Sequence, residues 1–299
     1  MTSTGAGPGI AFAVATLGIA VFSCMDALMK GLTLEIGVYN TMLWRSVAGA
    51  LIGAVAHFRR GAGLPGRATL RIHFERGAVA TVMAILFFWG LARVPMAQAV
   101  ALTFIAPLIA LFLAAWLLKE RIDRRAIIAS LIAFVGVLTI LAGQARAELG
   151  REAFVGALAI LLSAVCYAYN IILMRRQAMV ADGREVAFYQ NFTVALFLGV
   201  VAPLYAVVPD LLHVPALTGA AVLATISMFL LTWAYGRAEA SYLAPVEYTA
   251  FVWASILGYL VFGEHVGPLT AAGAMLIAGG CLLAARRKSI PMANLEGIS

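Results

Sequence analysis

The chain has 299 residues, of which 63% are hydrophobic and 12% are charged, and its formal net charge is +7. A soluble domain carries about 25% charged residues, so this composition excludes a protein with a mostly water-facing surface. The length allows many apolar helices of about 20 residues, the number needed to cross a bilayer. The sequence therefore predicts an all-α polytopic membrane protein, with the lipid bilayer as a partner.

Ten membrane-spanning helices can be placed along the chain, each bounded by charge, proline or glycine. They cover 10–31, 38–57, 77–93, 96–118, 126–143, 153–174, 186–208, 215–236, 241–262 and 267–285. The longest connection, 58–76, is basic and is expected to lie along the membrane surface. Two cytoplasmic tails, 1–9 and 286–299, are expected to flank the spans.

The basic residues divide unevenly between the two sides of this arrangement. With the N-terminus inside, sixteen Lys and Arg residues fall on the cytoplasmic side and four on the other. Because cytoplasmic loops are enriched in Lys and Arg, both termini are predicted in the cytoplasm and the protein in the inner (plasma) membrane. This placement accounts for the positive charge, so no nucleic acid is expected as a partner.

An internal repeat appears when the chain is compared with itself at an offset of 144 residues. The matched pairs include Trp89 with Trp233, Arg93 with Arg237, Glu120 with Glu264, and Gly136 with Gly280. The two copies, 10–143 and 153–285, each hold five spans. An odd number of spans places the second copy upside down in the membrane, which predicts two five-helix inverted repeats with a substrate site between them.

The runs PMAQAVALTFIAPLIALFLAAWLLKERI (95–122) and SYLAPVEYTAFVWASILGYLVFGEHV (241–266) resemble the EamA domain of the drug/metabolite transporter superfamily, which includes aromatic amino acid exporters. The resemblance rests on two short corner motifs, each at the end of a helix, Lys119-Glu120-Arg121 and Gly263-Glu264-His265. His265 departs from the basic residue that is usual at its position. The resemblance implies ten helices around a central cavity. Spans 1, 3, 4, 6, 8 and 9 would line that cavity, and spans 5 and 10 would lie at the edge.

Polar side chains within membrane spans are costly and commonly face a wet interior. In the first span, Ser23 and Asp26 share a helical face with Lys30. Asp26 either binds an amino group or a proton at the outer mouth of the cavity, or pairs with Lys30 four residues away. In the sixth span, Tyr167 and Asn170 share a face and are expected to line the cavity, with a hydrogen bond that only links helices as the alternative.

Three further candidates are apolar. Met83 and Phe87 are expected either to pack in the core or to form a wall for a flat apolar substrate. Met228 repeats at helical spacing with Thr225 and Thr232 in the eighth span and is expected to contact the substrate. Thr103 precedes Pro107, which removes a backbone donor. That position is either a hinge or a static kink.

Glu247 lies inside an apolar run, two residues after Pro245. Pro245 predicts irregular backbone, which membrane proteins tolerate where it is buried in protein or wetted. Glu247, Tyr248 and Phe251 then either line the cytoplasmic half of a pathway, with Glu247 binding an ammonium group or a proton, or have a structural role. In the structural role, Glu247 would hydrogen-bond a neighbouring helix end or pair with Arg237.

Few basic residues lie in the cavity helices, which argues against phosphorylated substrates because these call for Arg or Lys clamps. Aromatic, Met and Asn side chains with one or two carboxylates suit aromatic or neutral amino acids, related metabolites or organic cations. The sequence therefore predicts a secondary transporter that exports small molecules, with drug export, a channel and an intramembrane enzyme as alternatives. No HExxH or GxSxG motif is present, and no enzyme activity, metal or cofactor is expected. The oligomeric state stays open.

Overall fold

The computed structural model describes residues 8–59, 64–118, 124–146, 150–238 and 240–285. Within these residues every regular element is a helix, as predicted. The helices are α1 (Pro8–Phe58), α2 (Arg67–Leu91), α3 (Met96–Thr103), α4 (Ala106–Leu118), α5 (Arg124–Arg146), α6 (Gly150–Ala178), α7 (Gly183–Val200), α8 (Ala202–Tyr205), α9 (Val214–Tyr235), α10 (Ala240–Glu247), α11 (Thr249–Phe262) and α12 (Pro268–Ala285).

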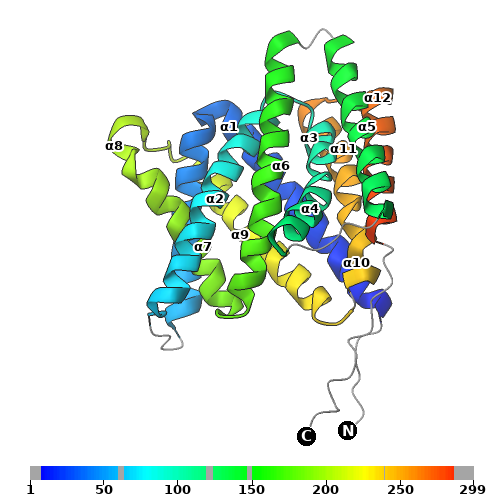
Figure 1. Cartoon of the computed structure of the whole chain (residues 1–299). Coiled ribbons are helices and arrows are strands. Elements are labelled where there is room, and N and C mark those ends of the chain that lie inside the picture. Colours follow the sequence, from blue (N-terminus) through cyan, green and yellow to red (C-terminus); the bar gives the residue numbers. More distant parts are fainter. Residues whose placement is uncertain (1–7, 60–63, 119–123, 147–149, 239, 286–299) are drawn as a thin grey trace, which may run out of the picture.

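The first two expected spans are joined in α1, which bends at Gly37. The backbone there has φ 77° and ψ 155°, a conformation that glycine adopts far more readily than residues with a Cβ. The second half of α1 then runs back toward the end of the molecule where the helix began (Figure 1).

Two expected boundaries are wrong. The surface segment expected over 58–76 is helical from Arg67, and it belongs to α2, because its buried residues extend the helical pattern of the third span. The seventh span was expected over 186–208, but α7 ends at Val200 and only the short α8 follows.

The fourth and ninth expected spans are each interrupted, and at equivalent positions. α3 and α10 are both eight residues long, and their bounds differ by the 144-residue offset of the repeat. The residues at the breaks, Phe104 and Tyr248, are also equivalent. Their rings meet edge to face with centroids 5.1 Å apart, so the two breaks meet where the repeats contact each other.

Helix packing follows the same symmetry. α5 packs along α12, and the pair stands at one edge of the molecule (Figure 1). A Cβ on Gly136 would lie 2.7 Å from the Gly273 carbonyl oxygen, and a Cβ on Gly280 would lie 2.6 Å from that of Ala129. At the 144-residue offset, Gly136 corresponds to Gly280, and Ala129 corresponds to Gly273. The two close approaches are therefore the same contact, made once from each repeat.

Two aromatic–cation pairs repeat in the same way. The Arg93 guanidinium lies 3.6 Å from the Trp89 ring centroid, and that of Arg237 lies 4.1 Å from the Trp233 ring centroid. Each Arg also donates to the carbonyl of its own Trp, at 2.9 Å and 3.2 Å. The matched sequence pairs therefore correspond to matched local structure.

Large apolar side chains are exposed along the outer helices, for example Leu51 at 65%, Leu131 at 60% and Val200 at 74%. Six helical stretches among the described residues are long and apolar enough to cross a membrane. The multi-pass prediction is supported, while the count of ten spans and the domain boundaries remain predictions. The start of α1 and the end of α12 lie at the same end of the molecule (Figure 1), called here the termini end.

Candidate functional site

Tyr167 on α6 marks the place where charged groups of both repeats come together. Its side chain is 39% exposed, yet it lies within electrostatic reach of Arg76 on α2 and Glu247 on α10. A cation of the first repeat, an anion of the second and an aromatic ring therefore lie near one another between helices of both repeats. We call this group the central site.

Arg76 is held in place by a chain of polar contacts across three helices. Its Nε donates to Asn170 Oδ1 at 3.2 Å, and a second guanidinium nitrogen donates to Gln177 Oε1. Gln177 Nε2 lies 2.5 Å from His73 Nδ1, and His73 Nε2 lies 2.9 Å from Glu185 Oε1. These contacts join α2, α6 and α7, so they fix the direction in which the guanidinium points.

The sequence analysis misses Arg76, which it places in the expected surface segment. The buried residues of α2 include His73, Gly77 and Ala80. Their helical spacing is the signal that would have extended the third span toward the N-terminus and brought Arg76 into the protein interior. The structure thus adds a cation to a cavity that was expected to hold few.

Glu247 is the last residue of α10, two positions after Pro245. Its carboxylate is exposed and accepts a hydrogen bond from the Tyr235 hydroxyl at 2.8 Å, so the expected bond to a neighbouring helix end is present. The alternative pair with Arg237 does not form, because the Arg237 side chain lies over the Trp233 ring.

Tyr248, Phe251 and Thr103 surround the two helix breaks. Tyr248 and Phe251 pack against the main buried core, and the Phe104 carbonyl at the break accepts a bond from Cys281 Sγ at 3.0 Å. The Thr103 hydroxyl donates to a carbonyl of its own helix at 2.7 Å. These contacts stabilise the interrupted backbone.

Pro107 is the second residue of α4, and Pro245 lies inside α10. Each proline is therefore within four residues of a break, although the two prolines are not at equivalent positions in the repeats. Proline removes a backbone donor, which contributes to the interruption. Their action as hinges remains a prediction.

Ser23 and Asp26 lie deeper in α1 and are almost fully buried, at 3% and 5% exposure. Asp26 lies within electrostatic range of Arg45, in the other half of α1. Asp26 Oδ1 has no hydrogen-bond partner among the described residues. The alternative of an Asp26–Lys30 pair is wrong, because Lys30 pairs with Glu264.

Met83, Phe87 and Met228 are all half-buried. The Met83 carbonyl accepts a bond from Ser163 at 2.8 Å, and the Phe87 ring lies edge to face with Phe88 at 5.1 Å. Met83 and Phe87 therefore contribute to helix packing while keeping some accessible surface, and both of their expected roles remain open. The expected role of Met228 remains a prediction.

A second polar cluster lies at the end of the molecule opposite the termini. The Lys30 ammonium donates to the Val94 carbonyl at 2.8 Å and to Glu264 Oε1. Glu264 Oε2 accepts from the Met96 backbone N–H at 2.8 Å. The ammonium also lies 5.1 Å from the centroid of the Phe262 ring. The corner residue Glu264 thus joins the two repeats, while the first corner, 119–121, lies outside the described residues.

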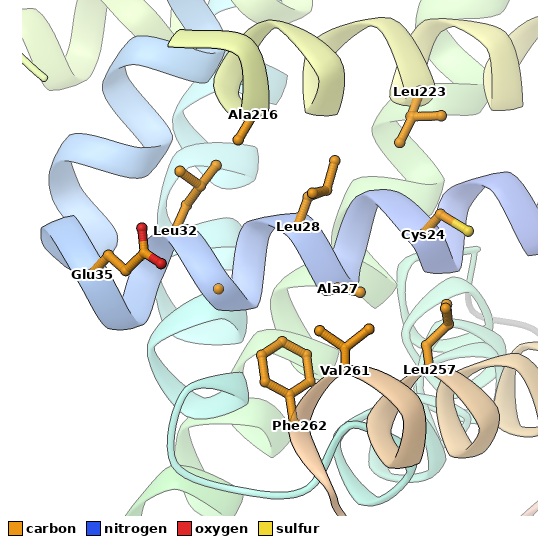
Figure 2. Close-up of a pocket in the computed structure, with 11 residues that line it drawn as sticks. Cys24, Ala27, Leu28, Leu32, Glu35, Ala216, Leu223, Leu257, Val261 and Phe262 are labelled. Carbon is orange, nitrogen blue, oxygen red and sulfur yellow. The ribbon is translucent and has the colours of Figure 1, made fainter. Parts of the chain in front are cut away.

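An apolar groove with a volume of about 350 Å³ runs between α1, α9 and α11 near this cluster. Figure 2 shows Leu28 and Leu32 of α1 between Ala216 and Leu223 on one side and Val261 and Phe262 on the other. Glu35 lies at one end of the groove. The groove is thus a seam between the repeats.

Comparison with known proteins gives this arrangement a family. The EamA-like transporter family matches residues 9–142 and 154–286, one match for each repeat. The chain belongs to the EamA-like transporter family. The resemblance drawn from the two corner motifs is therefore confirmed.

Three relatives have sequences that match this chain over most of their lengths. The pseudopaline exporter of Pseudomonas aeruginosa is 26% identical over 279 residues, covering 92% of this chain and 95% of the relative. An uncharacterised transporter of Helicobacter pylori is 28% identical, covering 70% and 72%. The S-adenosylmethionine uptake transporter of Rickettsia bellii is 25% identical, covering 69% of each.

One solved crystal structure superposes on the chain with a TM-score of 0.63 at 21% identity, covering 92% of this chain and 96% of that one. At this identity the likeness supports the fold alone. Together, the family and the relatives identify the protein as a small-molecule transporter of the drug/metabolite type.

Proposed function

We propose that this EamA transporter exports aromatic or neutral amino acids, or metabolites related to them, by alternating access between two inverted repeats. One observation carries the proposal: Arg76 and Glu247 both lie within electrostatic range of the partly exposed Tyr167. A zwitterion needs a cation for its carboxylate, an anion for its ammonium group and, when aromatic, a flat surface for its side chain. The central site offers all three.

The remaining predicted residues extend this site. We assign Asn170 to orienting Arg76, and Met83, Phe87, Met228 and Phe251 to the apolar wall. The other assignments follow from position in the path, namely Ser23, Asp26, Thr103 and Tyr248 as polar lining, with Pro107 and Pro245 as the hinges. A proton is a further candidate ligand of Asp26 or Glu247.

The membrane orientation belongs to the same proposal. The excess of basic residues favours a cytoplasmic location for the termini end, in the inner membrane. Arg76 and Glu247 then lie in the cytoplasmic half of the protein, where an exporter first meets its substrate.

The names of the relatives support a substrate with an amino acid group but leave the direction open. One relative is named for uptake of S-adenosylmethionine, a compound that joins an amino acid group to an aromatic base. Another is named as an exporter. Organic cations are the second candidate class, which the exposed Glu247 carboxylate favours and the nearby Arg76 guanidinium disfavours.

Counterflow in proteoliposomes tests the proposal. Vesicles loaded with unlabelled tryptophan or phenylalanine should take up the labelled amino acid faster than protein-free vesicles, and Glu247→Gln should abolish the acceleration. S-adenosylmethionine and an organic cation serve as competitors. Exchange of a labelled organic cation, with no exchange of either amino acid, would replace the amino acid proposal with the second class.

A further inference from the structure

We propose that the Lys30–Glu264 ion pair is a one-sided gate, which holds closed the end of the molecule opposite the termini. The inference rests on the proposed alternating access and adds to it the residues that bias the two states. It concerns the polar cluster at that end, which the central site does not use.

The pair joins both repeats where they must separate for this end to open. Lys30 lies in the first repeat and Glu264 in the second, and their side chains are 3% and 18% exposed. Glu264 also accepts a hydrogen bond from the backbone N–H of Met96, the first residue of α3. Lys30 donates to the Val94 carbonyl, in the connection between α2 and α3. Opening this end would pull the ions apart or admit water between them.

The surroundings of the pair are apolar, which strengthens the attraction between the two charges. The Phe262 ring covers the Lys30 ammonium and at the same time lines the groove at the seam between the repeats (Figure 2). Breaking one partner of a buried pair leaves an uncompensated charge. Closure of this end is therefore favoured as long as both charges are present.

The repeat explains why the gate is one-sided. At the 144-residue offset, Glu264 corresponds to Glu120, but Lys30 corresponds to Met174. Methionine carries no charge, and Met174 accepts only a weak contact of 3.6 Å from Asn170. The acid is thus present in both repeats, while the cation is present in one.

The consequence is a bias in the empty transporter. The end opposite the termini stays closed, while the end nearer Arg76 and Glu247 is free to admit substrate. With cytoplasmic termini, this bias loads substrate from the inside.

A test uses a version in which Cys24, Cys166 and Cys281 are replaced by Ala, with one reporter thiol introduced by Ser23→Cys. Ser23 is buried and lies two helical turns from Lys30 on the same face of α1, so a membrane-impermeant maleimide added outside intact cells reaches it only when the gate opens. Glu264→Gln keeps an oxygen for the Met96 N–H and removes only the charge. It should raise the labelling rate about tenfold, and Lys30→Met should do the same.

Three controls give each outcome a meaning. Lys30→Arg keeps the charge and should label slowly. Met174→Lys should also speed labelling at position 23, because it adds the missing cation to the other end. In the Glu264→Gln background, a second reporter, introduced by Met174→Cys in place of Ser23→Cys, should become less reactive from the cytoplasmic side.

Unchanged labelling in Glu264→Gln would overturn the gate, and so would equal gains at both reporters, which indicate loosened packing. If Lys30→Met does not fold, Glu264→Gln carries the test. The labelling assay needs no substrate, so it can be interpreted even if amino acid counterflow is not observed. Conversely, unchanged labelling would not affect the interpretation of the counterflow assay.

Discussion

The two repeats are alike where they pack and unlike where they face the path. The Trp–Arg pairs, the helix breaks and the glycine contacts between α5 and α12 occupy equivalent positions. The polar residues of the proposed path do not match. The equivalent pairs are Ser23 with Tyr167, Asp26 with Asn170, Lys30 with Met174, and Thr103 with Glu247. A symmetric scaffold lets the protein exchange two states, whereas a substrate with a positive and a negative end requires unlike groups in the two halves.

The largest expected effect comes from removing the unlike charges. Arg76→Gln and Glu247→Gln should each lower counterflow of tryptophan by roughly 10- to 100-fold, since a hydrogen bond to a charged group contributes about 1.5–3 kcal/mol. Initial rates in proteoliposomes measure the loss, normalised to the amount of folded protein.

Two matched variants separate the site from its surroundings. Arg71→Gln removes an exposed charge from the same helix, five residues before Arg76, and should leave transport unchanged. Tyr235→Phe removes only the hydrogen bond to Glu247, and should cost less than Glu247→Gln. If Arg71→Gln impairs transport as strongly as Arg76→Gln, surface charge rather than the central site governs the rate.

The shared packing can be broken at a glycine. Gly280→Ala places a Cβ 2.6 Å from the Ala129 carbonyl oxygen, and should destabilise the protein by about 1–3 kcal/mol. The neighbouring Gly279 has open space at the same position, so Gly279→Ala should be neutral or slightly stabilising. Thermal melting in detergent distinguishes them, and equal melting points would contradict the close packing of α5 and α12.

A smaller effect is expected at the start of α7, outside the membrane-spanning segments. The backbone N–H groups of Glu185 and Arg184 donate to Asp182 at 2.8 Å and 2.9 Å, and these bonds, that from Glu185 foremost, lower the pKa of its carboxyl group. Asp182→Ala should cost about 1 kcal/mol at pH 7.

The pH dependence follows from the direction of that shift. A carboxylate with a lowered pKa stabilises the folded state above the ordinary carboxyl pKa and loses this effect as the pH falls through its folded value. The difference in melting point between the parent and Asp182→Ala should therefore shrink in acid. A difference that grows in acid would show that the carboxylate is not the stabilising form.

The smallest expected effect sharpens the equivalence of the repeats. Trp89→Leu and Trp233→Leu each remove one cation–π contact, and each should cost about 0.5–1 kcal/mol. The two losses should be similar and additive in the double variant, because the pairs lie at separate helix ends. A loss confined to one variant would mean that the matched geometry differs in strength between the repeats.

The sequence predicts the helical membrane class, the repeat and the family. Hydropathy and the matches at the 144-residue offset can be found from the order of the residues alone, without knowledge of their contacts in space. It also predicts that Tyr167 and Asn170 share a face of α6. It misses Arg76, since the apolar run that defines the third span begins after the helix does. It also misses the partner of Lys30, because Glu264 is 234 residues away and only the packing of the repeats brings the two together.

Substrates that lack one end of the zwitterion test the central claim most directly. The parent should exchange tryptophan faster than tryptamine, which has no carboxylate, and faster than indole-3-propionate, which has no ammonium group. Arg76→Gln should erase the preference over tryptamine alone, and Glu247→Gln the preference over indole-3-propionate alone. If both variants keep both preferences, Arg76 and Glu247 do not bind the carboxylate and ammonium groups of the substrate, and the site must lie elsewhere between the repeats.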